Sequence, residues 1–289
     1  MVCGVAGIVI AEFTFHPIRR QLKPEVAQHP ERYFASATSE EVAITAPDGA
    51  VLRGWYAEPR SPNGNAVLLL HGLSDNRLGM AGFSGFLLRS GYAVLLPDSR
   101  AHGESGGRIA TFGLLERGDV QEWVSWVQKR AHPRCIYGLG ESMGAAIMLQ
   151  SLAVEPRFCA VVVESPFATF QEAAQERIGR YAGMGPHWFG QTVGRPIIWS
   201  AELYGRLRYG VNLISANPLE AVDASSTPVL LIHGDHDTNL LPRNSESMWR
   251  AAPDHTELWL VPGAEHTGAY GIRPEEFERR VLGWFEQHR

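Results

Sequence analysis

The stretch Cys135-Ile-Tyr-Gly-Leu-Gly-Glu-Ser-Met-Gly-Ala-Ala-Ile-Met-Leu-Gln150 decides how this chain folds. Its first part, residues 135–139, is a short apolar run of the kind that forms a strand buried on both faces. Gly140-Glu141-Ser142-Met143-Gly144 follows, and then an Ala-rich segment of helical character. Glycines two positions before and after the serine indicate a turn so sharp that side chains there would collide. The order of strand, glycine-flanked serine and helix predicts a strained turn that exposes the hydroxyl of Ser142.

The alternation of buried strand and helix extends along most of the chain. Apolar and β-branched runs bounded by turn residues predict parallel strands over 66–70, 92–96, 135–139, 160–163, 228–232 and 257–261. Segments with helical periodicity lie between or after them, over 77–90, 114–130, 143–154, 243–251 and 274–287. Two earlier runs, 41–45 and 51–57, flank Pro47-Asp48-Gly49 and predict an antiparallel hairpin at one edge. The prediction is an α/β fold with a mostly parallel eight-stranded sheet and helices on both faces.

One long insertion interrupts this alternation. The segment between residues 163 and 228 is far longer than a crossover needs and is rich in aromatic residues. We expect a small, mostly helical cap at about 165–215, within a main domain of residues 41–289 that follows an N-terminal extension of residues 1–40. Phe167, Trp188 and Trp199 are candidates for the substrate pocket. Each also has a plainer interpretation, which is packing of the cap against the body.

The composition excludes several classes of function. Hydrophobic residues make up 45% of the chain and charged residues 20%, as in an ordinary globular protein. A net charge of -5 gives no indication of a basic surface for nucleic acid or for an anionic membrane. The chain has three cysteines, too few for a disulfide framework, so we expect Cys135 and Cys159 to be buried thiols in their apolar runs.

The N-terminal segment is almost entirely apolar from Val2 to Ala11, is interrupted by Glu12, and is followed by Arg19 and Arg20. It is shorter than the ~20 residues of a membrane-spanning helix. Its positive charge follows the apolar run, whereas a signal peptide carries that charge first. A truncated membrane anchor, an interfacial helix and a segment packed on the domain all remain open. We expect a weak membrane association through this segment, in a protein that is cytoplasmic or membrane-associated.

A serine nucleophile needs two partners elsewhere in the chain. Its hydroxyl is a weak nucleophile at neutral pH unless a base accepts its proton, and a carboxylate best holds that base in one tautomer. Asp237 follows the strand at 228–232, and His266 follows the strand at 257–261. We therefore expect Ser142, Asp237 and His266 to be nucleophile, acid and base. Asp235, on the same loop as Asp237, and Glu164, at another strand end, remain open as alternative acids.

Taken together, these motifs resemble the α/β-hydrolase superfamily, in particular its lipase/esterase and acyl-hydrolase branch. The resemblance covers the chain from about residue 41 to the C-terminus. It rests on four motifs in family order: His71-Gly72, Asp98-Ser-Arg-Ala-His-Gly-Glu-Ser-Gly-Gly107, Gly140 to Gly144, and His233-Gly-Asp-His-Asp237. The family usually has glycine where Ala101 stands, which leaves one local turn in doubt. The resemblance implies an oxyanion hole formed by the backbone N–H groups of Leu73 and Met143.

The resemblance also implies a reaction. We expect a serine hydrolase that cleaves carboxylic esters of small molecules through an acyl-enzyme on Ser142, and the aromatic cap favours an apolar acyl or aryl group. No cofactor is expected. The histidines and aspartates from His233 to Asp237 offer metal ligands on paper, but a turn that carries the acid explains them better. A peptidase or amidase, a thioesterase or lysophospholipase, and a catalytically inactive scaffold are the alternatives.

Overall fold

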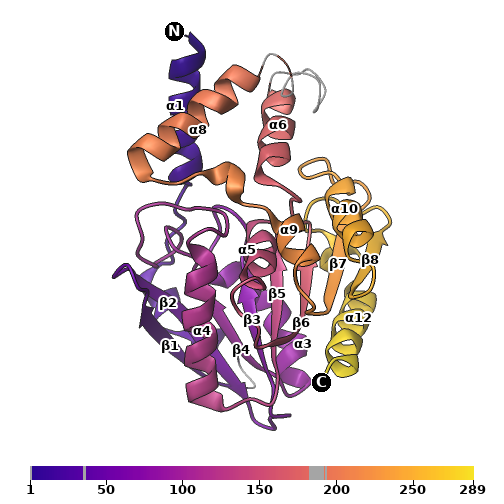
Figure 1. The fold of residues 1–289 in the computed structure, drawn as a ribbon. Helices are drawn as coiled ribbons and strands as arrows, with labels where there is room; N and C mark the ends of the chain where they lie inside the picture. Colours follow the sequence, from indigo (N-terminus) through magenta and orange to yellow (C-terminus); the bar gives the residue numbers. More distant parts are fainter. Residues whose placement is uncertain (1, 35–36, 182–191, 193) are drawn as a thin grey trace.

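A sheet of eight strands forms the centre of the molecule, with helices on both faces, in a computed structural model that describes residues 2–34, 37–181, 192 and 194–289 (Figure 1). The strand order is β1-β2-β4-β3-β5-β6-β7-β8. β1 pairs with β2 and β2 with β4 in antiparallel fashion, and the remaining pairs are parallel. The predicted fold class, including the edge hairpin, is therefore confirmed. The strands are β1 (Ala37–Thr45), β2 (Val51–Pro59), β3 (Ala66–Leu70), β4 (Ala93–Pro97), β5 (Ile136–Glu141), β6 (Phe158–Glu164), β7 (Val229–Gly234) and β8 (Thr256–Val261).

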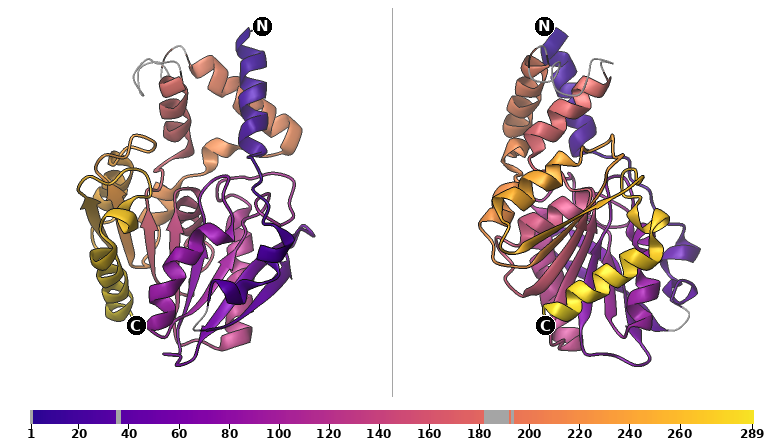
Figure 2. Two further views of the ribbon diagram at one scale, coloured as in Figure 1. Left: turned by 180° about the vertical axis from the view of Figure 1, so that it is seen from behind. Right: turned by 90° about the vertical axis from the view of Figure 1, so that its right-hand side faces the viewer.

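The helices divide into two layers on the sheet and a group at one end of it (Figures 1 and 2). The α-helices are α1 (Val2–Phe15), α2 (Pro24–Ala27), α3 (Ala81–Arg89), α4 (Glu116–Ala131), α5 (Met143–Ser151), α6 (Phe170–Tyr181), α8 (Arg195–Tyr209), α9 (Pro218–Asp223), α10 (Arg243–Ala251), α11 (Ala269–Ile272) and α12 (Pro274–Gln287). Short 3-10 helices are η1 (Pro30–Arg32), η2 (Arg77–Met80) and η3 (Leu213–Ser215).

Alternate residues of each central strand enter two separate hydrophobic cores. In β3, Leu68 and Leu70 pack into the core under α4 and α5, whereas Val67 and Leu69 pack into the core under α3 and α12. All five residues of β3 are buried, as expected for a parallel strand covered on both faces. This two-sided burial fixes the register of the sheet, and so fixes where its strand ends lie.

The expectation that Cys135 and Cys159 are thiols is wrong, because their sulfurs form a disulfide. Cys135 lies just before β5 and Cys159 lies in the neighbouring strand β6. The register shifts there, from Ile136 opposite Phe158 to Tyr137 opposite Ala160, so Cys159 is the extra residue of a bulge. The Cα atoms of the two cysteines are 5.7 Å apart, within the range that a disulfide needs. Strand pairing therefore brings together two cysteines that are 24 positions apart in the sequence.

The cap contains α6 and α8, as expected for an insertion between β6 and β7, and α1 lies beside α8 (Figures 1 and 2). The two helices approach closely at their glycines. A Cβ added at Gly7 would lie 2.9 Å from the amide nitrogen of Ala201, and one added at Gly205 would lie 2.9 Å from the ring of Phe15. The N-terminal segment thus packs on the rest of the protein. Among the described helices, none is long and apolar enough to cross a membrane.

Ala101, the single departure from the family motif, lies in a turn whose backbone conformation favours glycine. Ala101 has a φ of 58°, in the left-handed region that favours glycine. The turn is still made, and the amide of Ala101 donates to the carbonyl of Gly106. The alanine at this position therefore preserves the loop that follows β4.

Candidate active site

Ser142 lies at the sharp turn between β5 and α5, with φ 50° and ψ -111°. The two flanking glycines are required by close contacts. A Cβ added at Gly140 would lie 2.6 Å from the carbonyl oxygen of Gly144, and one added at Gly144 would lie 2.2 Å from that of Leu70. Real Cβ atoms do not approach so closely, so only glycine permits this turn. The strained backbone presents the hydroxyl of Ser142 at the carboxyl end of the parallel strands.

The three residues predicted to act together are hydrogen-bonded in series. Nδ1 of His266 lies 2.7 Å from Oδ2 of Asp237, and Nε2 of His266 lies 2.9 Å from Oγ of Ser142. The carboxylate can only accept, so Nδ1 carries the proton and Nε2 is free to accept one from the serine. Residues separated by 124 positions in the sequence, Ser142 and His266, thus meet because β5 and β8 end at the same edge of the sheet.

Asp237 is held as an ionised acceptor by its surroundings. Its Oδ1 accepts hydrogen bonds from the amides of Asn239 and Leu240, at 2.8 and 2.9 Å. Nε2 of His233 lies 3.3 Å from Oδ2 and also donates to the carbonyl of Leu240. Burial opposes ionisation, but the hydrogen bonds from His233 and His266 outweigh it and lower the pKa of Asp237 well below its usual value. His233 therefore has a positioning role, because it holds both the carboxylate of Asp237 and the carbonyl of Leu240.

The two alternative acids lie elsewhere. Asp235 is exposed, and its side chain accepts from the amide of Gly263. Glu164 is buried, and its Oε1 accepts from the amide of Ala269, just after the loop that carries His266. Burial raises the pKa of Glu164 to about 7. Neither carboxyl group is hydrogen-bonded to His266, so the geometry favours Asp237 as the partner of the histidine.

The loop after β3, which carries Gly72 and Leu73, passes close to Ser142. A Cβ added at Gly72 would lie 3.6 Å from Cβ of Ser142. The ring of His71 fixes this loop, because Ser99 N donates to its Nε2 at 3.0 Å and its Nδ1 donates to the carbonyl of Gly72 at 2.8 Å. The carbonyl of Gly72 and the N–H of Leu73 belong to the same planar peptide group, so this hydrogen bond also fixes the Leu73 amide. Burial lowers the pKa of His71, which keeps the ring neutral and able to accept from Ser99.

Leu73 and Met143, whose amides are predicted to form the oxyanion hole, line the same cavity as Ser142. In the part of the chain that the structure describes, neither amide donates a hydrogen bond to the protein. The Met143 amide is at the first position of α5, where a helix leaves its N–H groups without intrahelical partners. Two N–H groups are therefore free for an anionic oxygen beside the serine.

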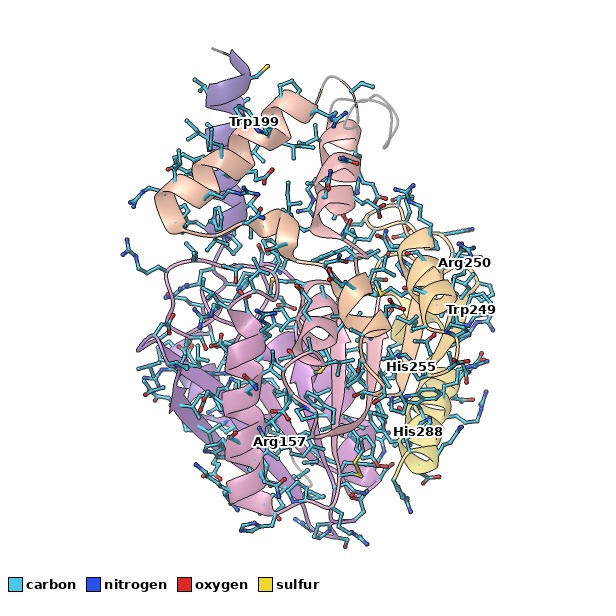
Figure 3. The ribbon with its side chains drawn as sticks, in the orientation of Figure 1. Arg157, Trp199, Trp249, Arg250, His255 and His288 are labelled. Carbon is cyan, nitrogen blue, oxygen red and sulfur yellow. A yellow bond between two sulfur atoms is a disulfide. The ribbon has the colours of Figure 1, made fainter. Side chains whose placement is uncertain are left out.

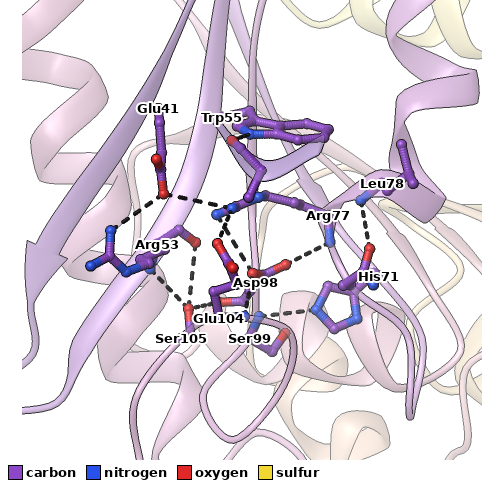
Figure 4. Close-up of polar contacts among 12 residues, drawn as sticks. Glu41, Arg53, Trp55, His71, Arg77, Leu78, Asp98, Ser99, Glu104 and Ser105 are labelled. Atoms are coloured by element: carbon purple, nitrogen blue, oxygen red, sulfur yellow. Dashed lines mark hydrogen bonds and ion pairs between the residues drawn. The ribbon is translucent and has the colours of Figure 1, made fainter. Parts of the chain in front are cut away.

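A buried ion-pair network supports the same loop region from behind (Figure 4). Arg77 is fully buried, and its guanidinium contacts Glu104 at 2.8 Å and Asp98 at 3.5 Å. It also lies over the ring of Trp55, 5.1 Å from the centroid. Asp98 accepts from the backbone amides of Arg77 and Glu104. The motif of residues 98–107 after β4 thus has a structural role, since it ties the loops after β3 and β4 together behind His71.

An apolar cavity of about 180 Å³ opens at the serine. Phe167 lines it, together with Phe112 and Leu240. The cap contributes residues from two helices: Phe170, Ala173, Ala174 and Ile178 from α6, and Ile198, Ala201 and Gly205 from α8. The expected role of Trp199 in the pocket is wrong, because it is 64% exposed and lies on another side of α8 (Figure 3). Trp188 lies outside the described residues.

One wall of the cavity, which is formed by α1, was not predicted from the sequence. Ile10, Ala11, Thr14 and Phe15 of α1 line it, so the N-terminal helix forms part of the candidate site. Glu12 anchors this helix to α8, since its Oε1 accepts from the hydroxyls of Tyr204 and Tyr209 at 2.6 and 2.7 Å. The apolar run of residues 2–11 was the available sequence signal, but it did not reveal the partner of the helix. Among the described residues, no cluster of three or more His, Cys, Asp or Glu side chains could hold a metal ion.

Comparison with known proteins places this site in a family. A family model described as "Alpha/beta hydrolase family" matches residues 67–280. The structure is similar to that of the esterase Pf2001 of Pyrococcus furiosus, with a TM-score of 0.74 and 26% identity over 94% of this chain and 99% of that chain. The uncharacterised proteins YqkD of Bacillus subtilis and YfhR of Escherichia coli K12 are each 27% identical to it. These matches cover 84% and 85% of this chain and 78% and 79% of theirs. The chain belongs to the alpha/beta hydrolase family.

Proposed function

We propose that this protein is a serine hydrolase that cleaves carboxylic esters through an acyl-enzyme on Ser142. The observation that carries the proposal is the hydrogen-bonded series from Ser142 through His266 to Asp237, which opens on an apolar cavity beside two unpaired amides. The similarity to the esterase Pf2001 supports an ester substrate. Because a fold hosts many reactions, the arrangement of these side chains is the stronger support.

The proposed reaction has two halves. Nε2 of His266 accepts the proton of Ser142 as Oγ attacks the carbonyl carbon, and the amides of Leu73 and Met143 stabilise the oxyanion. The imidazolium then gives its proton to the departing alcohol, which leaves an acyl group on the serine. Water, deprotonated by the same histidine, attacks this acyl group and releases the acid. Asp237 remains ionised and stabilises the imidazolium in both halves.

The cavity limits the acyl group. Its walls are mostly aliphatic or aromatic, and its volume of about 180 Å³ is smaller than the ~300–1,000 Å³ of sites for drug-sized ligands. At roughly 30 Å³ for each water-sized group, it holds about six such groups. We therefore propose short to medium apolar acyl chains as the preferred substrates.

A comparison of leaving groups tests the proposal against its closest alternatives. We expect turnover of nitrophenyl esters, rising and then falling with acyl length, and no turnover of aminoacyl-nitroanilides. Ser142→Ala should abolish ester cleavage, whereas Ser247→Ala, which removes a hydroxyl on α10 that donates to Asn244, should leave it unchanged. Turnover of the anilides alone would assign a peptidase or amidase instead, and the same series made with thioesters identifies a thioesterase.

A further inference from the structure

The two helices that form the outer part of the cap expose apolar side chains to solvent. On α1, Val5 is 60% exposed, Val9 47% and Phe13 76%. On α8, Trp199 is 64% exposed, Leu203 41% and Leu207 78%. In both helices these residues follow one another at intervals of four, so each set forms a stripe along one side. We call these six residues the outer cap face.

Helix geometry shows which way the outer cap face points. At 3.6 residues per turn, Val5 and Val9 lie on the side of α1 opposite Ala11 and Thr14, which line the cavity. The same reasoning places Leu203 and Leu207 on the side of α8 opposite Ile198 and Gly205, which line it as well. The two stripes therefore turn away from the cavity. Figures 1 and 2 show α1 and α8 side by side, projecting beyond the end of the sheet.

α1 is apolar on both sides, which an ordinary surface helix is not. Its inner side packs on α8 and lines the cavity, and its outer side has no covering in the described protein. A helix that is apolar all round is normally buried or in contact with lipid. Its 14 residues extend about 21 Å, less than the ~30 Å of a bilayer core. The described helix is thus too short to cross a membrane, and its length allows it to lie in a membrane surface.

The segments that supply α1 and the cap differ in net charge from the rest of the chain. Residues 1–23 and 165–217, which supply α1 and the cap, contain eight Arg or Lys and four Glu, a net charge of +4. The whole chain carries -5, so the remainder carries -9. Arg206 and Arg208 flank Leu207, and Arg20 and Lys23 follow α1; all four are exposed. The net charge of the chain conceals this basic end, which the sequence analysis did not detect.

We propose that the outer cap face docks on the surface of an anionic lipid layer. The apolar stripes enter the boundary between headgroups and acyl chains, and the surrounding Arg and Lys side chains contact the anionic headgroups. The acidic body then faces away from the negative surface. This docking places the cavity wall formed by α1 next to lipid, so, if the proposed function holds, the substrates are esters dissolved in or belonging to that layer.

Vesicle flotation tests the docking without relying on catalysis. The full chain carrying Ser142→Ala is mixed with vesicles of phosphatidylcholine, alone or with phosphatidylglycerol, and the bound fraction is measured against lipid concentration. We expect binding to the anionic vesicles and roughly fivefold weaker binding for each charge removed in Arg206→Gln and Arg208→Gln, which flank Leu207 of the outer cap face. Phe13→Ser with Leu207→Ser should weaken binding at least ~10-fold, because two large exposed side chains no longer enter the lipid.

A matched control separates the face from apolar exposure in general. Trp249→Ser with Leu260→Ser removes two exposed apolar side chains of the body, 42% and 37% exposed, and should leave vesicle binding unchanged (Figure 3). Circular dichroism checks that all variants remain folded.

Four results distinguish the possibilities. Failure of the Ser142→Ala chain to bind at millimolar anionic lipid overturns the proposal. The proposal is also overturned if the protein does not bind vesicles but sediments as a dimer, and if Phe13→Ser with Leu207→Ser dissociates that dimer. A second copy of the chain then covers the outer cap face. Vesicle binding by the Ser142→Ala chain, with no ester cleavage by the wild-type protein, supports the docking and refutes the proposed function. Cleavage of dissolved esters by the wild-type protein, without vesicle binding by the Ser142→Ala chain, does the reverse.

Discussion

Asp237→Asn is the most informative single change at the site, because the structure separates the charge of this residue from its other contacts. An asparagine oxygen can still accept from the amides of Asn239 and Leu240, so the loop should keep its shape. The substitution removes the anion 2.7 Å from Nδ1 of His266. The histidine then loses both the partner that fixes its tautomer and the charge that stabilises its imidazolium form.

The expected size of the effect follows from those two losses. In a triad of this geometry the change to asparagine lowers kcat by about 10³- to 10⁴-fold, which corresponds to roughly 4 to 5.5 kcal/mol of transition-state free energy. Asp235→Asn serves as the matched control, because it removes from the same loop a carboxylate whose one hydrogen bond among the described residues is with the amide of Gly263. We expect less than about threefold loss for that variant, within the usual effect of an exposed substitution.

The two variants are compared by the steady-state hydrolysis of a nitrophenyl ester from pH 4 to 9. Thermal unfolding checks that both are folded. Because the pKa of Asp237 is lowered, its ionised form and the stability that it contributes are complete above about pH 4 and are lost only as the pH falls further. The acidic limb of the wild-type profile should therefore not arise from Asp237. Equal losses in the two variants, or a larger loss for Asp235→Asn, would refute the assignment.

Four further changes test other parts of the account. Replacing Cys135 and Cys159 by serine should lower the free energy of unfolding, measured by urea denaturation, by about 3 kcal/mol. The disulfide closes a loop with a sequence separation of 24, and without it the unfolded chain regains the entropy of that loop. His71→Ala should lower kcat about 10- to 100-fold with little change in KM, because the peptide that carries the proposed oxyanion amide loses its anchor. Ala174→Leu should shift the preferred acyl chain of the nitrophenyl ester series to shorter lengths by filling the cavity, whereas Ala174→Ser should not. Glu164→Gln should raise the melting temperature above that of the wild type, by an amount that grows as the pH rises from 4.5 to 7. In this range the buried acid, with its pKa raised to about 7, is protonated in the folded chain but ionised in the unfolded one, which destabilises only the wild type.

The strands and the hydrogen-bonded series were predictable because their signals are local. Each strand is a short run whose burial on both faces demands apolar residues, and the turn at Ser142 demands glycine on either side. The chain order of serine, acid and histidine then follows from parallel strands ending at one edge. The sequence left Asp235 open as an alternative to Asp237, and the structure adds the physical reason that favours Asp237, a carboxylate directed at His266 and surrounded by donors.

The contacts between distant segments were not predictable in the same way. That α1 forms a wall of the cavity depends on its packing against α8, almost 200 residues later, and an apolar run gives no indication of its partner. The disulfide depends on a bulge that places Cys159 beside Cys135, which the spacing of the cysteines does not reveal. Trp199 was expected in the pocket for its aromatic character alone, but its direction is set by the rotation of α8.

The central claim is that Ser142 is the nucleophile, and covalent labelling with a fluorophosphonate tests it most directly. This reagent reacts with a serine only when a base activates its hydroxyl and an oxyanion site receives the phosphoryl oxygen. The account predicts a single adduct on Ser142, located by mass spectrometry of the peptide, that is absent in Ser142→Ala and retained in Ser247→Ala. Folded wild-type protein that takes up no label, or a label that persists in Ser142→Ala, would contradict it.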